Sequence, residues 1–394
     1  MSTENLLSDA IKGTPPSFVR GILKAAADPE VTSFAGGLPN PISFPQEDLL
    51  ASMERIVNTY GSAVFQYSIT AGLPELRQYL AERYNKKHGL HITADDIMIT
   101  TGSQQALDLI GKVLLNKGDG VIVEKPTYLA AIQAFALQQA KFYPVDLTEE
   151  GLDPEGLKAA LRQENVKFIY AIPNFQNPTG LTYTAENREK LYEILKDEEI
   201  VLVEDDPYGE LRFDDQYLPY IGAGRIKNSI VMGSFSKIVT PGMRLGYIIC
   251  QNPELMQKLS VAKEASDLHT NIFAQYLIWD YVTHNDLETH IAKIKKLYQS
   301  QAQAMMDAMK KYFPPTVKYT KPQGGMFLWV TLPEGISAMS IFQKTLDQKV
   351  AFVPGDPFYV DEKDVNCMRL NYTNADPQTI DEGIRRMGEI LKSL

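Results

Sequence analysis

Between residues 97 and 250, short apolar runs rich in β-branched residues alternate with segments of helical periodicity. The runs are IMITT from Ile97, GVIVE, KFIYAIP, IVLVEDD, SIVMGS and LGYIIC, and we expect helices between them near residues 104–115, 129–138 and 185–196. Strands that are apolar throughout and separated mostly by helices predict a mainly parallel central sheet flanked by helices, an α/β fold. Ligands of such sheets bind beyond the carboxyl ends of the strands, so functional side chains are expected there.

The pattern changes after about Asp280. A long charged helix is expected over residues 287–312, followed by strands in GGMFLWV, VAFVP and MRLNY and by a closing helix from Pro377. This order predicts a smaller α+β domain. We therefore expect an amino-terminal arm over residues 1–45 that contributes to the small domain and the substrate pocket, a large cofactor-binding domain over 46–285, and a small domain over 286–394.

Charge and composition exclude several classes of partner. The net charge of −10 argues against nucleic-acid binding, which needs clustered Lys and Arg. No apolar run approaches the roughly 20 residues of a membrane span, and the amino terminus lacks the pattern of an export signal. Cys250 and Cys367 are far apart, and the five histidines form no cluster. We expect a cytoplasmic protein without a metal, membrane or nucleic-acid partner.

The segment SFSKIVTPGMRLGY, residues 234–247, follows an expected strand and combines phosphate-binding side chains with a lysine. Ser234, Ser236 and Arg244 are able to donate hydrogen bonds to a phosphate. Lys237 is able to form an imine with an aldehyde on the same ligand. The alternative is a surface lysine in a serine-rich turn.

A second phosphate site is expected in TTGSQQALDLI, where a strand ends and a helix begins. The free N–H groups of Gly102, Ser103 and Gln104 would face an anion at the positive end of the helix dipole. The alternative is a plain serine N-cap, a common way to begin a helix.

The segment VEDDPYGELRF places two carboxylates at the end of an expected strand. An ionised carboxylate beside a pyridine nitrogen keeps that nitrogen protonated, which makes the ring an electron sink. We favour Asp205 over Asp206 for this position, because neighbours on an extended strand point to opposite sides. Tyr208 is a candidate partner for a hydroxyl on the same ring.

Three further residues are candidates for ring or substrate contacts. Asn177 in PNFQNPTG would donate to the ring oxygen, although this stretch is also ordinary turn sequence. Tyr128 in EKPTYLA would stack on the ring, or serve as a core aromatic residue. Arg369 in MRLNY would pair with the α-carboxylate of an amino acid, the alternative being a structural salt bridge.

In order and spacing, these motifs resemble the fold-type I, class I/II aminotransferases that depend on pyridoxal 5'-phosphate, and the resemblance covers nearly the whole chain. It implies the aspartate aminotransferase type of fold. It implies that Lys237, Asp205 and Tyr128 are catalytic, and that Arg369 and Asn177 bind substrate. The implied cofactor-binding residues are Tyr67, Ser103, Gln104, Tyr128, Asn177, Asp205, Tyr208, Ser234, Ser236, Lys237 and Arg244. Tyr67, in FQYSITAGLPELR, resembles a tyrosine that reaches the neighbouring subunit's cofactor, which implies a homodimer with shared active sites.

The forms FQNPTG, EDDPY and GGMFLWV are most similar to the group of 2-aminoadipate and kynurenine aminotransferases and to the aminotransferase-like half of certain transcriptional regulators. Those regulators carry an amino-terminal DNA-binding domain, whereas here the enzyme-like arm begins almost at once, which favours an enzyme. By the same resemblance, Gly37 and Arg20 line the substrate side-chain pocket. Their alternative roles are a glycine turn and a surface arginine.

The resemblance implies ping-pong transfer of an amino group from an L-amino acid to a 2-oxo acid such as 2-oxoglutarate, with Lys237 as the imine-forming residue and proton shuttle. The donor would have an aromatic, 2-aminoadipate, branched-chain or similar side chain. Two alternatives use the same site: a β-lyase that releases pyruvate and ammonia, and a non-catalytic sensor of pyridoxal phosphate and amino acids.

Overall fold

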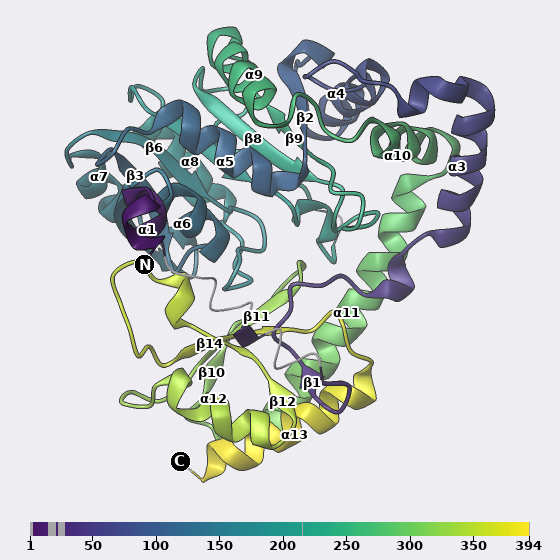
Figure 1. Ribbon diagram of the computed structural model, residues 1–394. Helices are drawn as coiled ribbons and strands as arrows, with labels where there is room; N and C mark the ends of the chain where they lie inside the picture. Colours follow the sequence, from purple (N-terminus) through teal and green to yellow (C-terminus); the bar gives the residue numbers. More distant parts are fainter. Residues whose placement is uncertain (1–2, 15–20, 23–27, 215, 394) are drawn as a thin grey trace.

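The computed structural model describes residues 3–14, 21–22, 28–214 and 216–393, and its larger part is built on an eight-stranded sheet (Figure 1). In spatial order the strands are β2 (Ile97–Thr100), β9 (Gly246–Ile249), β8 (Ser229–Ser234), β7 (Val201–Asp205), β6 (Val166–Ala171), β3 (Gly120–Lys125), β4 (Lys141–Thr148) and β5 (Gly151–Leu152). Only β9 and β5 run against the others among these strands. The predicted mainly parallel sheet is confirmed.

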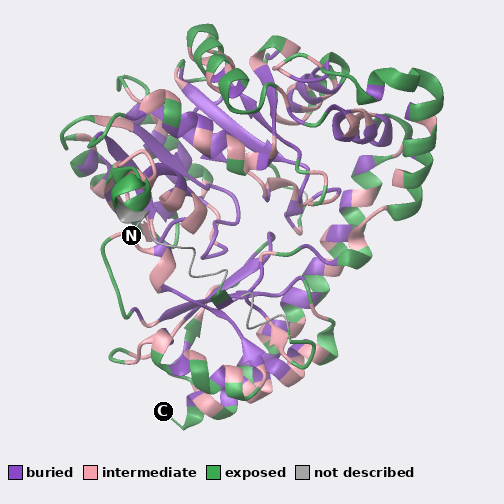
Figure 2. Ribbon diagram, in the orientation of Figure 1, coloured by how far each residue is buried: buried purple, intermediate pink, exposed green. Residues whose placement is uncertain are grey.

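Helices cover both faces of this sheet because its central strands are apolar on both sides. In β3, Val121 and Val123 belong to one hydrophobic core and Ile122 to another, as the alternation of side chains along a strand requires. The first core includes residues of α5 (Gly102–Leu114) and α6 (Leu129–Ala136), and the second includes residues of α7 (Pro154–Leu161) and α8 (Ala185–Leu195). Figure 2 shows the buried strands between helices with exposed outer faces.

The remaining helices of this part extend the covering layers and the edge of the molecule. They are α3 (Gln46–Tyr60), α4 (Pro74–His88), α9 (Pro253–Asp267) and α10 (Ile272–His284). Helix α10 packs against both α3 and α4, and α9 packs against α5. The short α1 (Asp9–Lys12) lies near the amino terminus. Among the described residues, no helix is both long enough and apolar enough to cross a lipid bilayer.

The long helix α11 (Leu287–Tyr312) leads from the large sheet to a smaller α+β part (Figure 1). Its four-stranded sheet has the order β10 (Lys318–Tyr319), β11 (Phe327–Thr331), β14 (Cys367–Asn371) and β13 (Val353–Pro354). Helices α12 (Ala338–Asp347) and α13 (Pro377–Lys392) complete this part, and α13 packs along α11. The amino-terminal strand β1 (Thr32–Ser33) pairs with β12 (Val350–Ala351), so the arm lies against the small part.

One predicted strand is wrong as a single element. VAFVP divides at Phe352: β12 pairs with β1 in one sheet, and β13 pairs with β14 in another. Each piece is two residues long, and the two pieces pair with different strands, β12 with a strand of the amino-terminal arm and β13 with β14 later in the chain. Local hydrophobicity carries no information about such pairings, which explains the error.

Candidate functional site

A cavity of about 250 Å³ lies beyond the carboxyl ends of β7 and β8, between the large sheet and strands β11 and β14. We call it the central cavity. Its lining residues are Gly37, Ser103, Gln104, Tyr128, Leu129, Ile172, Asn177, Asp205, Pro207, Tyr208, Ser234, Ser236, Lys237, Pro241, Arg244, Phe327 and Arg369. Of the predicted site residues, Tyr67 does not line this cavity, and Arg20 lies outside the described residues. The fold thus brings together the other twelve.

One end of the cavity is formed by the first turn of α5 and the loop after β8. The helix begins at Gly102, where φ is +70° and an added Cβ would lie 2.7 Å from Nη2 of Arg244. Only a glycine therefore allows the guanidinium to approach the helix start this closely. In the facing loop the N–H of Ser236 donates to Oγ of Ser234 at 3.1 Å. The unpaired N–H groups of the first turn and these side chains form a donor-rich end suited to an anion.

Lys237 follows β8 and reaches across the cavity to the amino-terminal arm. Its Nζ donates a hydrogen bond to the carbonyl oxygen of Gly37 at 2.9 Å. Burial, together with the positive charges of Arg369 and Arg244, lowers the pKa of Lys237 from 10.5 to about 8. A substantial fraction of the amine is therefore neutral near physiological pH, which a nucleophile or proton acceptor requires.

Asp205 is the last residue of β7 and has one carboxylate oxygen free. Its Oδ2 accepts a hydrogen bond from Oη of Tyr170 at 2.6 Å, whereas Oδ1 is buried and has no partner in the part of the chain that the structure describes. Burial raises the pKa of Asp205 to about 7, and the bond from Tyr170 opposes that rise. An unpaired buried carboxylate oxygen is costly, and a proton donor in the cavity would relieve the cost.

Asp206 belongs to a different site. Its carboxylate accepts hydrogen bonds from Tyr220 at 2.7 Å, from Asn174 at 3.0 Å and from the N–H of Gly209 at 2.9 Å. It lines a separate cavity of about 300 Å³, and does not line the central one. The structure thus places the two neighbouring carboxylates as the strand periodicity predicted.

Arg369 lies on β14 and closes the opposite side of the cavity. Nη1 donates to Oδ1 of Asn177 at 2.9 Å, and Nη2 donates to the carbonyl oxygen of Ala35 at 2.8 Å, while Nε is buried and finds no partner among the described residues. The guanidinium carbon lies 4.3 Å from the ring centroid of Phe327 and 5.2 Å from that of Phe358. Burial lowers the pKa of Arg369 to about 10. Within the described part of the chain, this cation has no carboxylate partner.

Asn177 connects Arg369 to Tyr208. While its Oδ1 accepts from Arg369, its Nδ2 lies 3.5 Å from the hydroxyl of Tyr208, at the limit of a hydrogen bond. Tyr128 is the N-cap residue of α6, and its half-buried side chain also lines the cavity. Burial raises the pKa of both tyrosines, so each hydroxyl is neutral and able to donate.

Tyr67 has a different environment. Its side chain is 80% exposed, and its ring meets His269 edge-on at 5.9 Å between centroids. In this single chain it does not reach the central cavity. No group of three or more His, Cys, Asp or Glu in the described ranges has an arrangement able to hold a metal ion.

Two contributors to the site were missed by the sequence analysis. Tyr170 lies within the apolar run KFIYAIP, where a hydroxyl on a buried strand was the only sign of a polar role. Its contact with Asp205 arises from the pairing of β6 with β7. Phe327 lies within GGMFLWV and lines the cavity beneath Arg369. A hydrophobic strand residue of this kind carries no local mark of function.

Comparison with known proteins supplies the family. The family described as "Aminotransferase class I and II" matches residues 44–387. The chain is similar to an aromatic-amino-acid aminotransferase of Thermococcus litoralis (40% identity over 99% of this chain and 94% of the relative) and to a 2-aminoadipate transaminase of Thermus thermophilus (41% over 96% and 94%).

Solved structures agree with this. A kynurenine aminotransferase of Pyrococcus horikoshii in complex with PMP has a TM-score of 0.95 and 41% identity, covering 100% of this chain and 98% of its own. A Thermus thermophilus α-aminoadipate aminotransferase, complexed with N-(5'-phosphopyridoxyl)-L-leucine, has a TM-score of 0.93 and 38% identity, covering 100% and 99%. The chain therefore belongs to the class I and II aminotransferases, enzymes that depend on pyridoxal phosphate.

Proposed function

We propose that this aminotransferase accepts L-amino acids with aromatic, 2-aminoadipate or branched-chain side chains as donors, and a 2-oxo acid such as 2-oxoglutarate as acceptor, in a ping-pong sequence. The support is that relatives named for aromatic amino acids and for 2-aminoadipate match nearly the whole chain. The leucine adduct of the Thermus thermophilus structure extends the range of candidates to branched side chains.

The observation that carries the proposal is a set of three incomplete groups around one cavity. Lys237 has an amine with a lowered pKa, Asp205 has a buried oxygen without a partner, and Arg369 is a buried cation without a salt bridge, all judged among the described residues. The unpaired oxygen and the uncompensated charge cost free energy, whereas the Lys237 amine is hydrogen-bonded to Gly37 and has yet to form a covalent bond. An aldehyde, a ring nitrogen and an α-carboxylate would complete them, and pyridoxal phosphate with an amino acid provides all three.

The residues present fit pyridoxal phosphate group by group. The first turn of α5 with Ser103 and Gln104, and the loop side chains of Ser234, Ser236 and Arg244, would hold the phosphate. Asp205 would contact the ring nitrogen through its free Oδ1, Asn177 and Tyr208 would contact the ring oxygen, and Tyr128 would stack on the ring. The close approach of Arg244 to Gly102 supports placing the phosphate at this end of the cavity, because it brings the guanidinium beside the start of α5.

When bound, pyridoxal phosphate supplies an electron sink for the carbanion that forms at the substrate Cα. Arg369 would hold the α-carboxylate and so turn the Cα–H bond toward Lys237. Lys237, whose pKa is about 8, would take the Cα proton as a neutral amine, hold it at Nζ as an ammonium, and deliver it to the aldehyde-derived carbon of the cofactor instead of to Cα. Holding the two groups side by side makes the proton transfer effectively intramolecular, an advantage of up to about 7–11 kcal/mol. Asp205 would keep the ring nitrogen protonated throughout.

The proposal includes a homodimer in which Tyr67 of the partner subunit reaches the phosphate end of the cavity. Its support is that Tyr67 is 80% exposed and lies between two other exposed apolar residues, Phe65 at 68% and Ile69 at 51%. A cytoplasmic location is part of the proposal and is supported by two buried free cysteines, Cys250 and Cys367. We also propose domain boundaries near residues 45 and 285. The boundary near 285 is supported by the two separate sheets, because the eight-stranded sheet precedes it in sequence and the four-stranded sheet follows it.

The half-reaction tests this function directly. Purified enzyme loaded with pyridoxal phosphate is mixed with one amino acid at a time, without a 2-oxo acid, and the formation of pyridoxamine phosphate is followed by absorbance and chromatography. We expect conversion with aromatic and 2-aminoadipate donors, and none with Lys237→Ala. Release of pyruvate and ammonia without pyridoxamine phosphate would instead indicate a β-lyase, and binding without conversion would indicate a sensor.

Trapping with borohydride identifies the attachment residue. We expect the labelled peptide to contain residue 237 in the wild type and in Lys227→Ala, which removes an exposed lysine nearby. A label on another peptide of the wild type would contradict the proposal.

A further inference from the structure

The carboxylate of Asp205 is held from inside the sheet by a single side chain. The register of β6 and β7 pairs Tyr170 with Val203, so Tyr170 lies on the same face of the sheet as Val203 and Asp205. From there its hydroxyl donates to Oδ2 at 2.6 Å. The other oxygen, Oδ1, remains unpaired, and Asp205 lines the central cavity. Tyr170 thus fixes which oxygen of Asp205 is left for a ligand.

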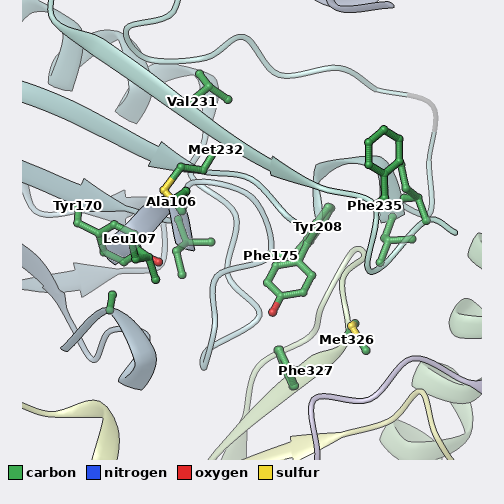
Figure 3. Packing of buried hydrophobic residues seen from close by; sticks show 14 of the residues in the cluster. Ala106, Leu107, Tyr170, Phe175, Tyr208, Val231, Met232, Phe235, Met326 and Phe327 are labelled. Carbon is green, nitrogen blue, oxygen red and sulfur yellow. The ribbon is translucent and has the colours of Figure 1, made fainter. Parts of the chain in front are cut away.

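Tyr170 itself does not line the cavity. Its side chain is fully buried, its ring meets Phe135 at 5.8 Å between centroids, and Figure 3 shows it among the residues of the main hydrophobic core. It touches neither the space for the cofactor nor that for the substrate. We therefore expect Tyr170 to influence the reaction chiefly through Asp205, to which its hydroxyl donates.

We propose that Tyr170 is a positioning residue that keeps the cofactor's ring nitrogen protonated, by donating a hydrogen bond to the ionised carboxylate of Asp205 and so limiting its basicity. The inference rests on the proposed function, in which Asp205 contacts that nitrogen. A carboxylate that is too basic would hold the shared proton itself. The neutral ring would then be a poorer electron sink.

The charges around Asp205 make this hydrogen bond important. Burial raises the pKa of Asp205 to about 7, and the negative charges of Asp206 and Glu124 act in the same direction. The bond from Tyr170 is the opposing influence, since a donor stabilises the ionised form. Tyr128 and Tyr208 also face this carboxylate but stay neutral, because burial raises the pKa of each.

The test compares Tyr170→Phe with Tyr183→Phe. Tyr183 is a matched control: it is also fully buried, and its hydroxyl donates at 2.6 Å to a buried carboxylate, that of Glu124. Glu124 and Tyr183 do not line the central cavity. Both variants lose one hydroxyl and one hydrogen bond to a carboxylate, but only Tyr170→Phe removes a bond to the partner proposed for the ring nitrogen. Tyr183→Phe reaches Asp205 only through the charge of Glu124. Because Glu124 becomes easier to protonate without that bond, the influence on the pKa of Asp205 is downward, opposite to that of Tyr170→Phe.

Each protein is loaded with pyridoxal phosphate labelled with ¹⁵N at the ring. The ¹⁵N chemical shift reports the protonation of that nitrogen, and a pH titration of the visible absorption band reports the proton affinity of the nitrogen joined to Lys237. We expect a protonated ring nitrogen in the wild type and in Tyr183→Phe. In Tyr170→Phe the ¹⁵N chemical shift should move toward that of neutral pyridine. The pH at the midpoint of the absorption titration should rise by about one unit.

A second variant guards against a failure of Tyr170→Phe to fold. Site-specific 3-fluorotyrosine at position 170 retains the ring and makes the hydroxyl a stronger donor, so the midpoint should fall instead of rising. Wild-type values in both position-170 variants, or an equal change in Tyr183→Phe, would overturn the inference about Tyr170 but leave the proposed function intact. A neutral ring nitrogen in the wild type would overturn the proposed role of Asp205 as well.

Discussion

At the scale of single residues, the proposed function gives Lys237 two tasks that place opposite demands on its charge. As a nucleophile and proton acceptor it must be neutral, and as a proton donor it must be charged. The neighbouring cations Arg369 and Arg244, together with burial, lower its pKa to about 8, so both forms are populated near neutral pH. An exposed lysine, with its ordinary pKa near 10.4, would be almost wholly charged there.

This pKa predicts how the apoenzyme takes up its cofactor. Only the neutral amine attacks an aldehyde, so the rate of covalent attachment of pyridoxal phosphate should rise with pH and level off above about pH 8. In Arg244→Gln one nearby positive charge is absent, so the pH at which the attachment rate is half-maximal should rise. Stopped-flow absorbance over a pH series measures both. A wild-type midpoint near pH 10 would show that the site does not lower the pKa of Lys237.

Arg369 allows a similarly direct prediction. Because its planar guanidinium lies over Phe327 and Phe358, a lysine would keep the charge but lose both the stacking and the paired donors. For Arg369→Lys we expect kcat/KM for amino acids to fall about 10- to 100-fold, corresponding to about 1.5–3 kcal/mol for a hydrogen bond to a charged group. Turnover of an amine that lacks the α-carboxylate should change little.

A control variant separates this role from general stability. Arg212 is also buried, also lies over an aromatic ring, that of Phe175 at 5.3 Å, and does not line the central cavity. Arg212→Lys should leave kcat/KM for amino acids within a few-fold of the wild type. Carboxylate binding by Arg369 would be contradicted if kcat/KM for amino acids fell equally in Arg369→Lys and Arg212→Lys. It would also be contradicted if Arg369→Lys lost as much kcat/KM for the amine as for amino acids.

At the scale of elements, the loop that carries Asn177 is held against β11 by close backbone contact. At Gly180, φ is +72° and an added Cβ would lie 2.4 Å from the carbonyl oxygen of Phe327. The side chain of Gln176 fixes the same loop, since it donates to Glu124 and to the carbonyl of Pro126 and accepts from Thr179. The loop that presents Asn177 is therefore fixed to both sheets.

Gly180→Ala tests this contact, with Gly89→Ala as its control. Gly89 also has positive φ, +65°, but nothing lies within 4 Å of an added Cβ. Both variants should lose about 1 kcal/mol of stability from the strained backbone, as measured by denaturant unfolding, and Gly180→Ala should lose more because its Cβ also collides with a backbone oxygen. Only Gly180→Ala should also lower kcat/KM, because Phe327 and Asn177 line the cavity. Unchanged kinetics in Gly180→Ala would show that the contact does not position the site.

The elements differ in how far local sequence determines them. The helix over 287–312 was predicted with its exact bounds and that over 102–114 within two residues, because their apolar periodicity is continuous. The pieces of VAFVP could not be predicted, since each depends on its partner strand: β12 pairs with β1, which lies hundreds of residues away, and β13 pairs with β14, which follows later in the same sheet. The contact of Tyr170 with Asp205 is of the same kind: strand pairing creates it.

At the scale of the whole molecule, the site joins two sheets that the sequence presents far apart. Lys237 and Asp205 come from the large sheet, and Arg369 and Phe327 from the small one, yet all four line one cavity. The sequence indicated most of these residues because polar groups at strand ends interrupt apolar runs. It could not indicate Phe327, an apolar residue in an apolar strand. The proposed approach of Tyr67 to the site of a second subunit would depend on contacts between chains, which local sequence does not reveal.

A mixed dimer tests the shared site. Differently tagged Lys237→Ala and Tyr67→Phe chains are co-expressed, and the heterodimer is purified. If Tyr67 serves the neighbouring subunit, one site of the heterodimer pairs an intact Lys237 with an intact Tyr67 of the partner subunit, and activity at limiting pyridoxal phosphate should be about half that of the wild type. The Lys237→Ala homodimer should be inactive. The Tyr67→Phe homodimer should bind the cofactor about 10-fold or more weakly, since it lacks a hydrogen bond to a charged phosphate. If Tyr67 served its own subunit, the one site of the heterodimer with an intact Lys237 would carry Tyr67→Phe, and the cofactor affinity of that site would match that of the Tyr67→Phe homodimer.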